Sequence, residues 1–462
     1  MHTPPPFRNR KITVMGLGRF GGGIGVARFL AEQGARVLVT DQESAEALAA
    51  SVARIADLVA CGAVQLRLGE HRMEDFASAD MVVASPAVKP SSPFIAAARA
   101  AGVPVTSEIR LLAGHLPNRR RVIAITGSAG KSTTTALVGH ALGQLLEQEG
   151  RGRRVWVGGN IGGSLLASLP DIGADDWVVL ELSSFMLEGL REDRFSPGIA
   201  VVTNLAPNHL DWHPTLAEYA AAKKAIFQFQ GAGDTLLLGP DLAPWAAEAP
   251  AGVLTQAVAC DEAWWHAASH ARPSGGTFRL PGLHNRQNAR MAAAVGMAAG
   301  FASDAFFNAC CSFAGLKHRL QFVAEKRGVA YYNDSKSTTP EATMLAVDSF
   351  PPHTAHVLVG GKDKGSDLDA MAGHLAARAR VVYTVGAMGD AVADKVCARQ
   401  AAGRPSCEVV RAGTVERAVF EAAKRAMPGE VVVLSPAFAS WDQFANYEER
   451  GDRFVEQVMI QS

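Results

Sequence analysis

The chain of 462 residues lacks a net charge, because 45 Lys and Arg side chains are balanced by 45 Asp and Glu side chains. Without a global field to attract nucleic acid or an anionic membrane, any anionic ligand must be held by a local site. The chain also lacks a CxxC pair among its six cysteines, which indicates reduced thiols rather than a disulfide framework. These absences argue against a basic nucleic-acid-binding protein and against a small disulfide-stapled one.

Long apolar runs are absent as well. The longest weakly polar run, residues 291–302, is shorter than the ~18 residues that a membrane span needs. Residues 1–11 contain consecutive prolines and several charges but no apolar segment typical of a signal peptide. We therefore expect a cytoplasmic monomer that binds neither membranes nor nucleic acid.

The chain does contain many short runs rich in Val and Ile, separated by helical stretches rich in Ala and Leu. This alternation is typical of parallel sheets covered by helices. With apolar residues at 48% and charged residues at 19%, the composition is that of a globular α/β protein. The expected strands are Ile12–Met15, Val37–Thr40, Met81–Ala84, Val122–Thr126, Val178–Leu182, Ile199–Asn204, Val357–Val359 and Val431–Leu434.

The length predicts about three domains of ~150 residues each. Two segments interrupt the strand and helix alternation, and each precedes a new strand: the polar, proline-containing His115–Arg121 and the segment Gly315–Arg319. We therefore place boundaries at 117 and 318. The expected fold is a Rossmann-like domain at 1–117, a central P-loop-type ATPase domain with a mainly parallel sheet at 118–318, and a second Rossmann-like domain at 319–462.

The strongest motif is a strand that runs into a glycine-rich turn and then a helix, Ile123–Thr134. Successive backbone N–H groups of such a turn cradle phosphate oxygens, and the helix N-terminus adds positive potential. Lys131 would reach the terminal phosphates, and Ser132 or Thr133 would face Mg²⁺. The motif departs from the strict pattern because Ile125 stands where the first glycine would be. We interpret it as a nucleoside triphosphate site.

A second glycine cluster, Gly16, Gly18 and Gly21, follows the first expected strand, and Asp41 ends the second. This spacing is typical of dinucleotide dehydrogenases, in which the acid binds a ribose. The same pattern also occurs where strand and helix only pack tightly. A third interpretation is a site for the diphosphate of another nucleotide, such as a UDP-linked molecule, with Arg19 near the phosphates. The pattern alone does not choose among the three.

Four further candidate residues follow the phosphate loop. Glu181 ends an expected buried strand, where open α/β sheets bind ligands, so it would hold a metal or form a buried ion pair. His209 lies beyond the next strand and would be a ligand or a packed residue. Lys223 and Lys224 lie on an expected Ala-rich helix. Each would either take part in the site or simply lie on the solvent-exposed face of that helix.

Taken together, eight segments occur in an order that resembles the Mur ligases, over all three domains. The last two segments resemble the members of that family that use D-glutamate. The segments are Thr126–Thr133, Gly158–Gly162, Glu181–Phe185, Asn208–Asp211, Glu218–Lys223, Gly282–Ala289, Asn333–Thr338 and Leu434–Phe444.

The resemblance implies an amide-forming ligase that converts ATP to ADP and phosphate. ATP would phosphorylate the L-alanine carboxylate of UDP-N-acetylmuramoyl-L-alanine, and the amine of D-glutamate would attack the acyl phosphate. Because phosphorylation of a carboxylate crowds anionic oxygens together, cations must neutralise the developing charge. The reaction would belong to peptidoglycan precursor synthesis, and so to cell wall formation, cell shape and cell division.

The resemblance also assigns site residues. The catalytic set would be Lys131, Glu181, His209 and Lys223. Ser132 and Glu181 would hold one Mg²⁺, and His209 and a carbamylated Lys223 a second. ATP would be bound by Gly127, Ser128, Ala129, Gly130, Lys131, Ser132, Thr133, Thr134, Asn285, Arg319 and Asp334. The UDP substrate would be bound by Gly18, Arg19, Phe20, Gly21, Asp41, Asn160 and Ser183. D-glutamate would be bound by Lys336, Thr338, Lys364, Ser440 and Tyr447.

Several positions depart from the family pattern. Met186, Thr339 and Tyr447 stand where Gln, Asn and Phe are usual, Gly239 replaces part of an Asn-containing turn, and the tract Gly21–Gly25 is richer in glycine than the usual first-domain loop. Two other function classes compete with the ligase. An NAD-dependent oxidoreductase would use the first glycine cluster but would leave Lys131, Glu181 and Lys223 without a role. A non-catalytic ATP-binding protein would use the phosphate loop without forming an amide.

Overall fold

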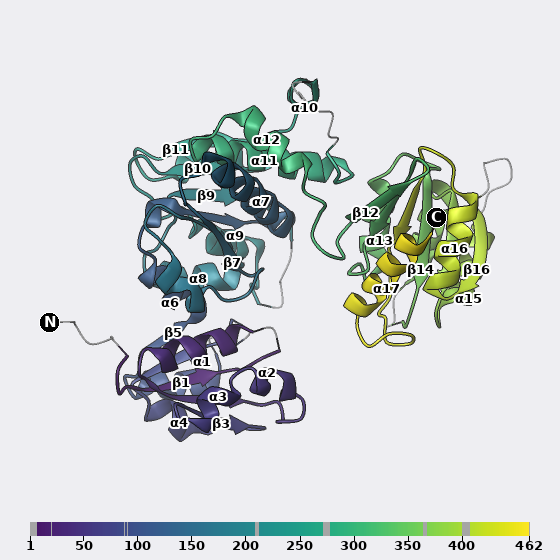
Figure 1. The fold of residues 1–462 in the computed structure, drawn as a ribbon. Coiled ribbons are helices and arrows are strands. Elements are labelled where there is room, and N and C mark those ends of the chain that lie inside the picture. The colour runs from purple at the N-terminus through teal and green to yellow at the C-terminus, as the bar shows by residue number, and fades with distance from the viewer. Residues whose placement is uncertain are drawn as a thin grey trace. The chain divides into compact units, whose positions relative to one another are not determined.

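The computed structural model describes residues 7–19, 21–86, 88–89, 91–207, 212–270, 278–363, 367–399 and 407–461. The strands form three sheets with helices around them (Figure 1), as the sequence predicts for a three-domain α/β fold. The chain divides into two compact units, Met1–Ala259 with Arg290–Phe306 and Cys260–Ala289 with Phe307–Ser462. The boundaries at 117 and 318 stay predictions.

The first sheet is entirely parallel, and its central strand β1 pairs with β2 on one side and β4 on the other. Ile12 of β1 lies beside Val37 and Met81 in this register. The strand order is β3 (Val64–Leu68), β2 (Arg36–Asp41), β1 (Lys11–Met15), β4 (Met81–Ala84) and β5 (Val105–Ser107). The helices are α1 (Gly22–Glu32), α2 (Ala49–Ala53), α3 (Ala56–Ala60), α4 (Met73–Ala77), α5 (Pro93–Ala100) and α6 (Glu108–His115).

The second sheet is also parallel, and the strand that leads into the phosphate loop, β6, lies between β9 and β8. The strand order is β11 (Leu254–Ala257), β10 (Thr235–Leu238), β9 (Ile199–Val202), β6 (Val122–Thr126), β8 (Trp177–Glu181) and β7 (Val155–Gly159). The helices of this part of the chain are η1 (Arg119–Arg121), α7 (Lys131–Glu149), η2 (Leu166–Asp171), α8 (Ser184–Glu192), α9 (Leu216–Lys224) and η3 (Pro240–Glu248). Helix α10 (Glu262–His270) belongs to the second unit, and the division between the units falls within α11 (Leu283–Ala298) and α12 (Ser303–Cys311).

The third sheet is mixed, because its edge strand β12 is antiparallel to β13 while the other pairs are parallel. Alternate residues of one strand face different cores: Val357 belongs to one hydrophobic cluster and Leu358 to another. The strand order is β12 (Gln321–Lys326), β13 (Val329–Asn333), β17 (Val431–Leu434), β14 (Ala355–Gly360), β15 (Val381–Val385) and β16 (Glu408–Gly413). The helices are α13 (Pro340–Asp348), α14 (Asp369–Arg378), α15 (Gly389–Ala398), α16 (Val415–Arg425) and α17 (Tyr447–Ile460).

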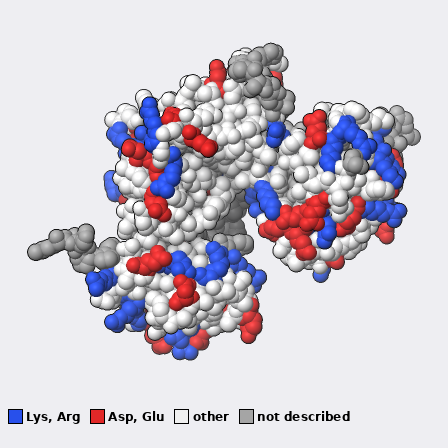
Figure 2. All heavy atoms as spheres, in the orientation of Figure 1, with Lys and Arg blue, Asp and Glu red and all other residues white. Residues whose placement is uncertain are grey.

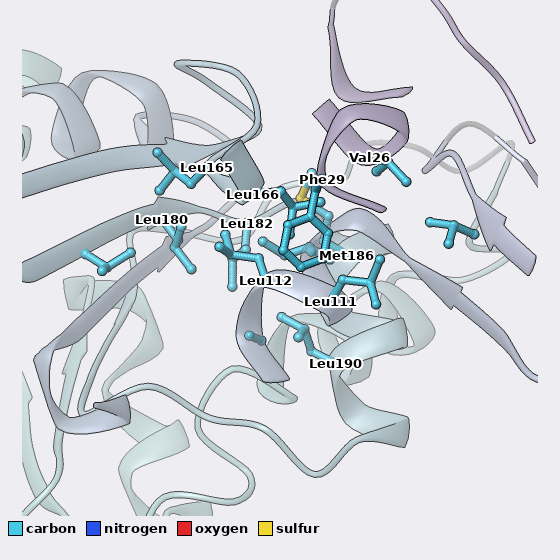
Figure 3. Close-up of a cluster of buried hydrophobic side chains, with 14 of the residues drawn as sticks. Val26, Phe29, Leu111, Leu112, Leu165, Leu166, Leu180, Leu182, Met186 and Leu190 are labelled. Atoms are coloured by element: carbon cyan, nitrogen blue, oxygen red, sulfur yellow. The ribbon is translucent and has the colours of Figure 1, made fainter. Parts of the chain in front are cut away.

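One hydrophobic core joins the elements of the first two sheets (Figure 3). Phe29 of α1 and Leu112 of α6 belong to the same cluster as Leu165, Leu180 and Leu190 of the following part of the chain. Burial of one such leucine contributes about 1.5–3 kcal/mol. The core therefore holds the first glycine cluster and the second sheet in a defined arrangement within the first unit.

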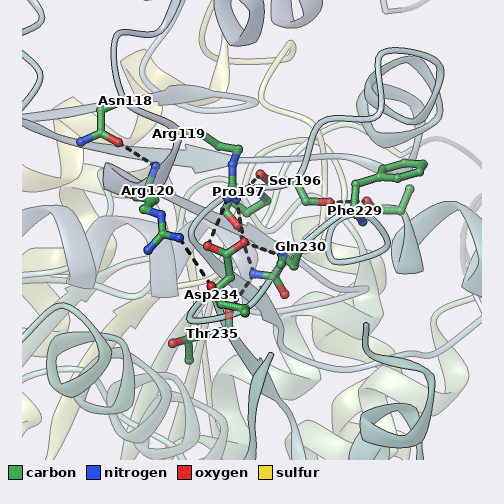
Figure 4. Close-up of polar contacts among 12 residues, drawn as sticks. Asn118, Arg119, Arg120, Ser196, Pro197, Phe229, Gln230, Asp234 and Thr235 are labelled. Atoms are coloured by element: carbon green, nitrogen blue, oxygen red, sulfur yellow. Dashed lines mark hydrogen bonds and ion pairs between the residues drawn. The ribbon is translucent and has the colours of Figure 1, made fainter. Parts of the chain in front are cut away.

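The polar segment predicted to interrupt the chain before β6 is anchored rather than loose (Figure 4). Arg119 donates to Asp234 at 2.8 Å and to the carbonyl of Ser196 at 3.0 Å. Asn118 caps the short helix η1 by accepting from the backbone N–H of Arg120 at 3.0 Å. These bonds tie the start of β6 to the loops that precede β9 and β10, so the phosphate loop at the other end of β6 starts from a fixed strand.

Two further expectations concern thiols and membranes. The six cysteines form no disulfide bond with one another, as the spacing predicts. Among the described residues, no helix is both long and apolar enough to cross a membrane. On the face drawn in Figure 2, basic and acidic side chains both occur on each unit, in line with the balanced composition.

Candidate functional site

The phosphate loop is built around two glycines with positive φ. Gly127 has φ 148°, and an added Cβ would lie 1.9 Å from Oγ1 of Thr203, so only glycine fits this turn. Gly130 has φ 79° and is the N-cap of α7. The Nζ of Lys131 donates to the carbonyls of Gly127 at 3.0 Å and Ser128 at 3.1 Å. The lysine therefore lies over the turn at the positive end of a long helix, as the sequence predicts.

Thr203 and Asn204 directly follow β9, the neighbour of β6 in the sheet, and hold the phosphate loop in place. The sequence did not indicate this role. Asn204 accepts from the N–H of Ala129 at 2.9 Å and donates to its carbonyl at 3.0 Å. Oγ1 of Thr203 donates to the same carbonyl at 2.6 Å. The expected strand Ile199–Asn204 is accordingly too long: β9 ends at Val202 because the next two residues turn toward the loop.

Lys223 is buried against the phosphate loop. The alternative prediction, that Lys223 lies on a solvent-exposed helix face, is therefore wrong. Its side chain is 1% exposed, and its Nζ donates to the carbonyl of Gly127 at 2.8 Å. The same Nζ lies 4.4 Å from the ring centroid of Tyr219. Burial, with a smaller contribution from the charge of Lys131, lowers the pKa of Lys223 to about 7. Lys224 instead pairs with Glu248 at the surface, with a 27% exposed side chain.

Glu181 is a buried carboxylate with one unsatisfied oxygen. Its side chain is 1% exposed, and Oε1 accepts from Nδ2 of Asn160 at 2.9 Å. Oε2 has no hydrogen-bond donor among the described residues. The buried ion pair, which was the alternative to a metal at Glu181, is therefore not formed with any described residue. A buried anionic oxygen without a partner is costly, and a hard cation such as Mg²⁺ would satisfy it.

No group of three or more His, Cys, Asp and Glu side chains suited to a metal occurs within the described ranges. Mg²⁺ commonly uses only one or two protein carboxylates and takes its other ligands from water and phosphates. Glu181 and the buried hydroxyl of Ser132, 8% exposed, fit such a sparse donor set. The predicted ligand His209 lies outside the described residues.

A cavity of about 450 Å³ lies in the first unit between the first glycine cluster and the loop after β7. Gly18 and Asn160, both predicted to bind the UDP substrate, line it together with Glu108 and Ser164. Ser164 donates to Glu108 at 2.8 Å, and burial raises the pKa of Glu108. Met186, one of the departures from the family pattern, also lines this cavity.

The other residues predicted for the UDP substrate have different surroundings. Asp41 accepts from the N–H groups of Leu17 at 2.9 Å and Gly18 at 3.1 Å, so it braces the glycine turn. Arg19 pairs with Glu43 at the surface at 2.9 Å, and Ser183 caps α8. Arg19, Asp41 and Ser183, like Gly21, do not line the cavity, and Phe20 lies outside the described residues.

The second unit holds the other predicted ATP residues. Asp334 follows β13, is 5% exposed, and accepts from Ser435 at 2.8 Å and from the N–H of Leu320 at 3.1 Å. Burial raises the pKa of Asp334 to about 6. Arg319 is exposed, and Asn285 donates to the carbonyl of Pro281 at 2.7 Å. Their contacts with ATP stay predictions.

The residues predicted for D-glutamate follow neighbouring strands of the third sheet. Lys336 and Thr338 follow β13, and Ser440 follows β17, its parallel neighbour. The Nζ of Lys336 lies 5.4 Å from the ring centroid of Tyr447, and burial raises the pKa of Tyr447 to about 12. Lys364 lies outside the described residues.

Two departures from the family pattern have local roles in the structure. Thr339 is the N-cap of α13 and accepts from the N–H of Ala342 at 3.4 Å. Gly239 approaches the backbone so closely that an added Cβ would lie 1.9 Å from the carbonyl oxygen of Thr203. These residues therefore shape loops next to the predicted sites.

Comparisons with known proteins cover the whole chain. Three family models match in order: the Mur ligase MurD-like N-terminal domain at 10–107, the Mur ligase middle domain at 125–296, and the Mur ligase glutamate ligase domain at 318–438. The chain is 38% identical to the UDP-N-acetylmuramoylalanine--D-glutamate ligase of Koribacter versatilis, over 98% of this chain and 97% of that protein. It is 37% identical to the protein of the same name from Pelotomaculum thermopropionicum, over 98% of each.

A solved structure supports the fold. The crystal structure of UDP-N-acetylmuramate-alanine ligase MurC from Thermotoga maritima is similar with a TM-score of 0.53 and 20% identity, over 98% of this chain and 100% of that one. At this identity the similarity concerns the fold alone.

Proposed function

The chain belongs to the Mur ligase family, and we infer from this that it joins D-glutamate to UDP-N-acetylmuramoyl-L-alanine, with conversion of ATP to ADP and phosphate. The relatives at 36–38% identity that carry this activity in their names match this chain over nearly its full length. The product is a cytoplasmic peptidoglycan precursor. The observation that supports the chemistry most directly is the pair of lysines, Lys131 and Lys223, on the carbonyl of Gly127.

The two lysines have different roles. Lys131 lies over the phosphate loop, where its ammonium group would neutralise the oxygens of the phosphoryl group that moves to the L-alanine carboxylate. Lys223 is a poor cation in its buried position and is neutral in a large fraction at neutral pH. A neutral amine reacts with CO₂: the nitrogen lone pair forms the N–C bond, one C=O pair becomes an anionic oxygen, and a proton leaves to solvent.

The resulting carbamate changes the sign of the charge at Lys223 from positive to negative. The carbamate and His209 would then hold one divalent cation. Glu181 and Ser132 would hold another, which is supported by Oε2 of Glu181, a buried oxygen without a hydrogen-bond donor among the described residues. A bound Mg²⁺ supplies positive charge next to the phosphates of ATP. Asn160, which orients Glu181 and lines the cavity, would place the muramoyl-alanine arm.

The carbamate predicts a pH-dependent requirement for CO₂. With a pKa of about 7, Lys223 is mostly neutral at pH 8 and mostly protonated at pH 6. Enzyme depleted of CO₂ should therefore regain activity on addition of a fixed concentration of dissolved CO₂ several-fold faster at pH 8 than at pH 6. Recovery rates that do not depend on pH, or full activity without CO₂, would contradict the carbamate.

The acceptor amino acid gives a second test in solution. Lys336, Lys364, Thr338 and Ser440 offer two cations and two hydroxyls, a set suited to two carboxylates. Phosphate release in the presence of UDP-N-acetylmuramoyl-L-alanine should be fast with D-glutamate and slow with L-glutamate, L-lysine and meso-diaminopimelate. A diamino acid brings a second ammonium toward the lysines, and the L-isomer held by both carboxylates directs its amine elsewhere. Equal rates with D-glutamate and a diamino acid would refute the assignment.

The dehydrogenase alternative has less support. Both oxygens of Asp41 are engaged: Oδ2 accepts from Leu17 and Gly18, and Oδ1 accepts from the N–H of Glu43 at 3.0 Å. These three backbone donors take up most of the roughly four acceptor positions of the carboxylate, so the bracing of the glycine turn accounts for Asp41 without a ribose. Absence of NAD binding by calorimetry, alongside amide formation coupled to ATP, would exclude both the oxidoreductase and the non-catalytic ATP-binding protein.

A further inference from the structure

Arg450, in the first turns of α17, is a buried arginine without a carboxylate partner for its hydrogen bonds. Its side chain is 2% exposed. Nε donates to Oγ of Ser335 at 3.0 Å, Nη2 donates to the carbonyl of Ser335 at 2.9 Å, and Nη1 donates to the carbonyl of Phe438 at 3.0 Å. Burial lowers the pKa of Arg450 to about 10, so the guanidinium is still charged at neutral pH.

The three acceptor atoms belong to two residues, Ser335 and Phe438, which lie in different loops at the carboxyl edge of the third sheet. Ser335 follows β13 and directly precedes Lys336, whereas Phe438 follows β17 and lies two residues before Ser440. The two loops also meet directly, because the N–H of Ala437 donates to the carbonyl of Ser337 at 3.0 Å. One planar guanidinium therefore sets the spacing between two loops that carry predicted D-glutamate residues.

A third loop, which follows β14, lies against the same guanidinium. An added Cβ on Gly361 would lie 3.2 Å from Nη1 of Arg450 and 2.3 Å from the carbonyl oxygen of Ala439, so only glycine allows this approach. The N–H of Lys362 donates to that same carbonyl at 2.8 Å. Arg450 thus lies at the junction of three loops, two of which carry predicted acceptor-binding residues that the structure describes, Lys336 and Thr338 in one and Ser440 in the other.

We propose that Arg450 is a positioning residue for the acceptor amino acid, which holds these three loops at the spacing that D-glutamate requires. This inference rests on the proposed D-glutamate site. Because Arg450 uses three nitrogens of its fork for three acceptors, a lysine with one ammonium cannot reproduce the arrangement. Because the acceptors are uncharged, the positive charge of Arg450 is not cancelled by a hydrogen-bonded carboxylate, which favours an acidic ligand nearby.

The test compares Arg450→Lys with Arg453→Lys. Arg453 lies on the same helix, has a 46% exposed side chain, and makes ion pairs with Glu416 and Glu456. For Arg450→Lys we expect the KM for D-glutamate to rise about tenfold or more, as for loss of charge-assisted hydrogen bonds, while the KM for ATP stays within about twofold. Arg453→Lys should leave both unchanged.

The outcomes distinguish the positioning role of Arg450 from the D-glutamate site on which it rests. A parallel rise in both KM values with a lowered melting temperature, or no change in either, would show that Arg450 only stabilises the domain. If Lys336→Ala and Thr338→Ala leave the KM for D-glutamate unchanged, the proposed site itself is wrong. If those two variants raise it and Arg450→Lys does not, the inference about Arg450 alone fails.

A milder variant covers the case in which Arg450→Lys does not fold. Ser335→Ala removes the hydroxyl that accepts from Nε and donates to the carbonyl of Tyr447 at 2.7 Å, but keeps the backbone acceptor. We expect about a threefold rise in the KM for D-glutamate without change in the KM for ATP, because one of the three hydrogen bonds of the guanidinium is lost and two remain. An unchanged KM for D-glutamate in a folded Ser335→Ala enzyme would overturn the inference.

Discussion

Replacement of Lys131 by alanine is expected to lower turnover on the order of 10³-fold, because a preorganised cation in phosphoryl transfer contributes at least that much. The structure places Nζ of Lys131 on the carbonyls of Gly127 and Ser128, next to the N-terminus of α7. The charge is therefore in place before ATP binds. Steady-state release of phosphate with all three substrates measures the effect.

The loss should lie in turnover rather than in folding. Two hydrogen bonds of Lys131 are to carbonyls of its own loop, and circular dichroism and melting temperature measure whether the variant keeps the wild-type fold. Lys224→Ala, which removes a surface lysine paired with Glu248, serves as the matched control and should retain nearly full activity. Near-normal ligation by Lys131→Ala would refute the role of the phosphate loop.

Replacement of Lys223 by alanine should also nearly abolish ligation, but for a different reason. A free ammonium beside Mg²⁺ would repel it, whereas a carbamate on Lys223 supplies an anionic oxygen ligand. Loss of that ligand should lower activity by more than the ~100-fold that loss of an outer-shell partner reaches. A short added carboxylate, such as formate or acetate, should restore part of the activity, since it can occupy the space of the missing carbamate.

Lys224→Ala again gives the contrast, because it lies next to Lys223 on α9 but at the surface. Only the Lys223 variant should respond to the added carboxylate. A stronger effect at Lys224 than at Lys223, or a Lys223→Ala enzyme with wild-type turnover, would show that the buried lysine serves packing and not chemistry. Mass spectrometry of the intact wild-type protein under CO₂ would detect the carbamate directly.

Local sequence patterns predicted the elements that depend on local physics. The run of buried residues Val122–Thr126 and the turn from Gly127 to Gly130 form one continuous segment, and the structure places the strand at the predicted bounds. The expected strands omit the edge strands and also the interior strands β10, β13 and β15. The five residues of β3, for example, alternate polar and apolar side chains and include one exposed and three half-buried positions. The search for runs rich in Val and Ile missed this strand, although its alternation is typical of a half-buried strand.

The sequence by itself determined the three-sheet α/β class, the phosphate loop and the order of the family's segments, because each is written in contiguous residues. It could not separate Lys223 from Lys224, since the Ala-rich α9 has no strongly apolar face and either lysine could point inward. Asn204 reaches Ala129 from 75 residues away and Arg450 reaches Ser335 from 115 residues away. Only the packed sheets bring these groups within hydrogen-bonding distance, and the same burial lowers the pKa of Lys223. Long-range packing therefore decided which polar residues are held at the site, because that choice depends on contacts between segments far apart in the chain.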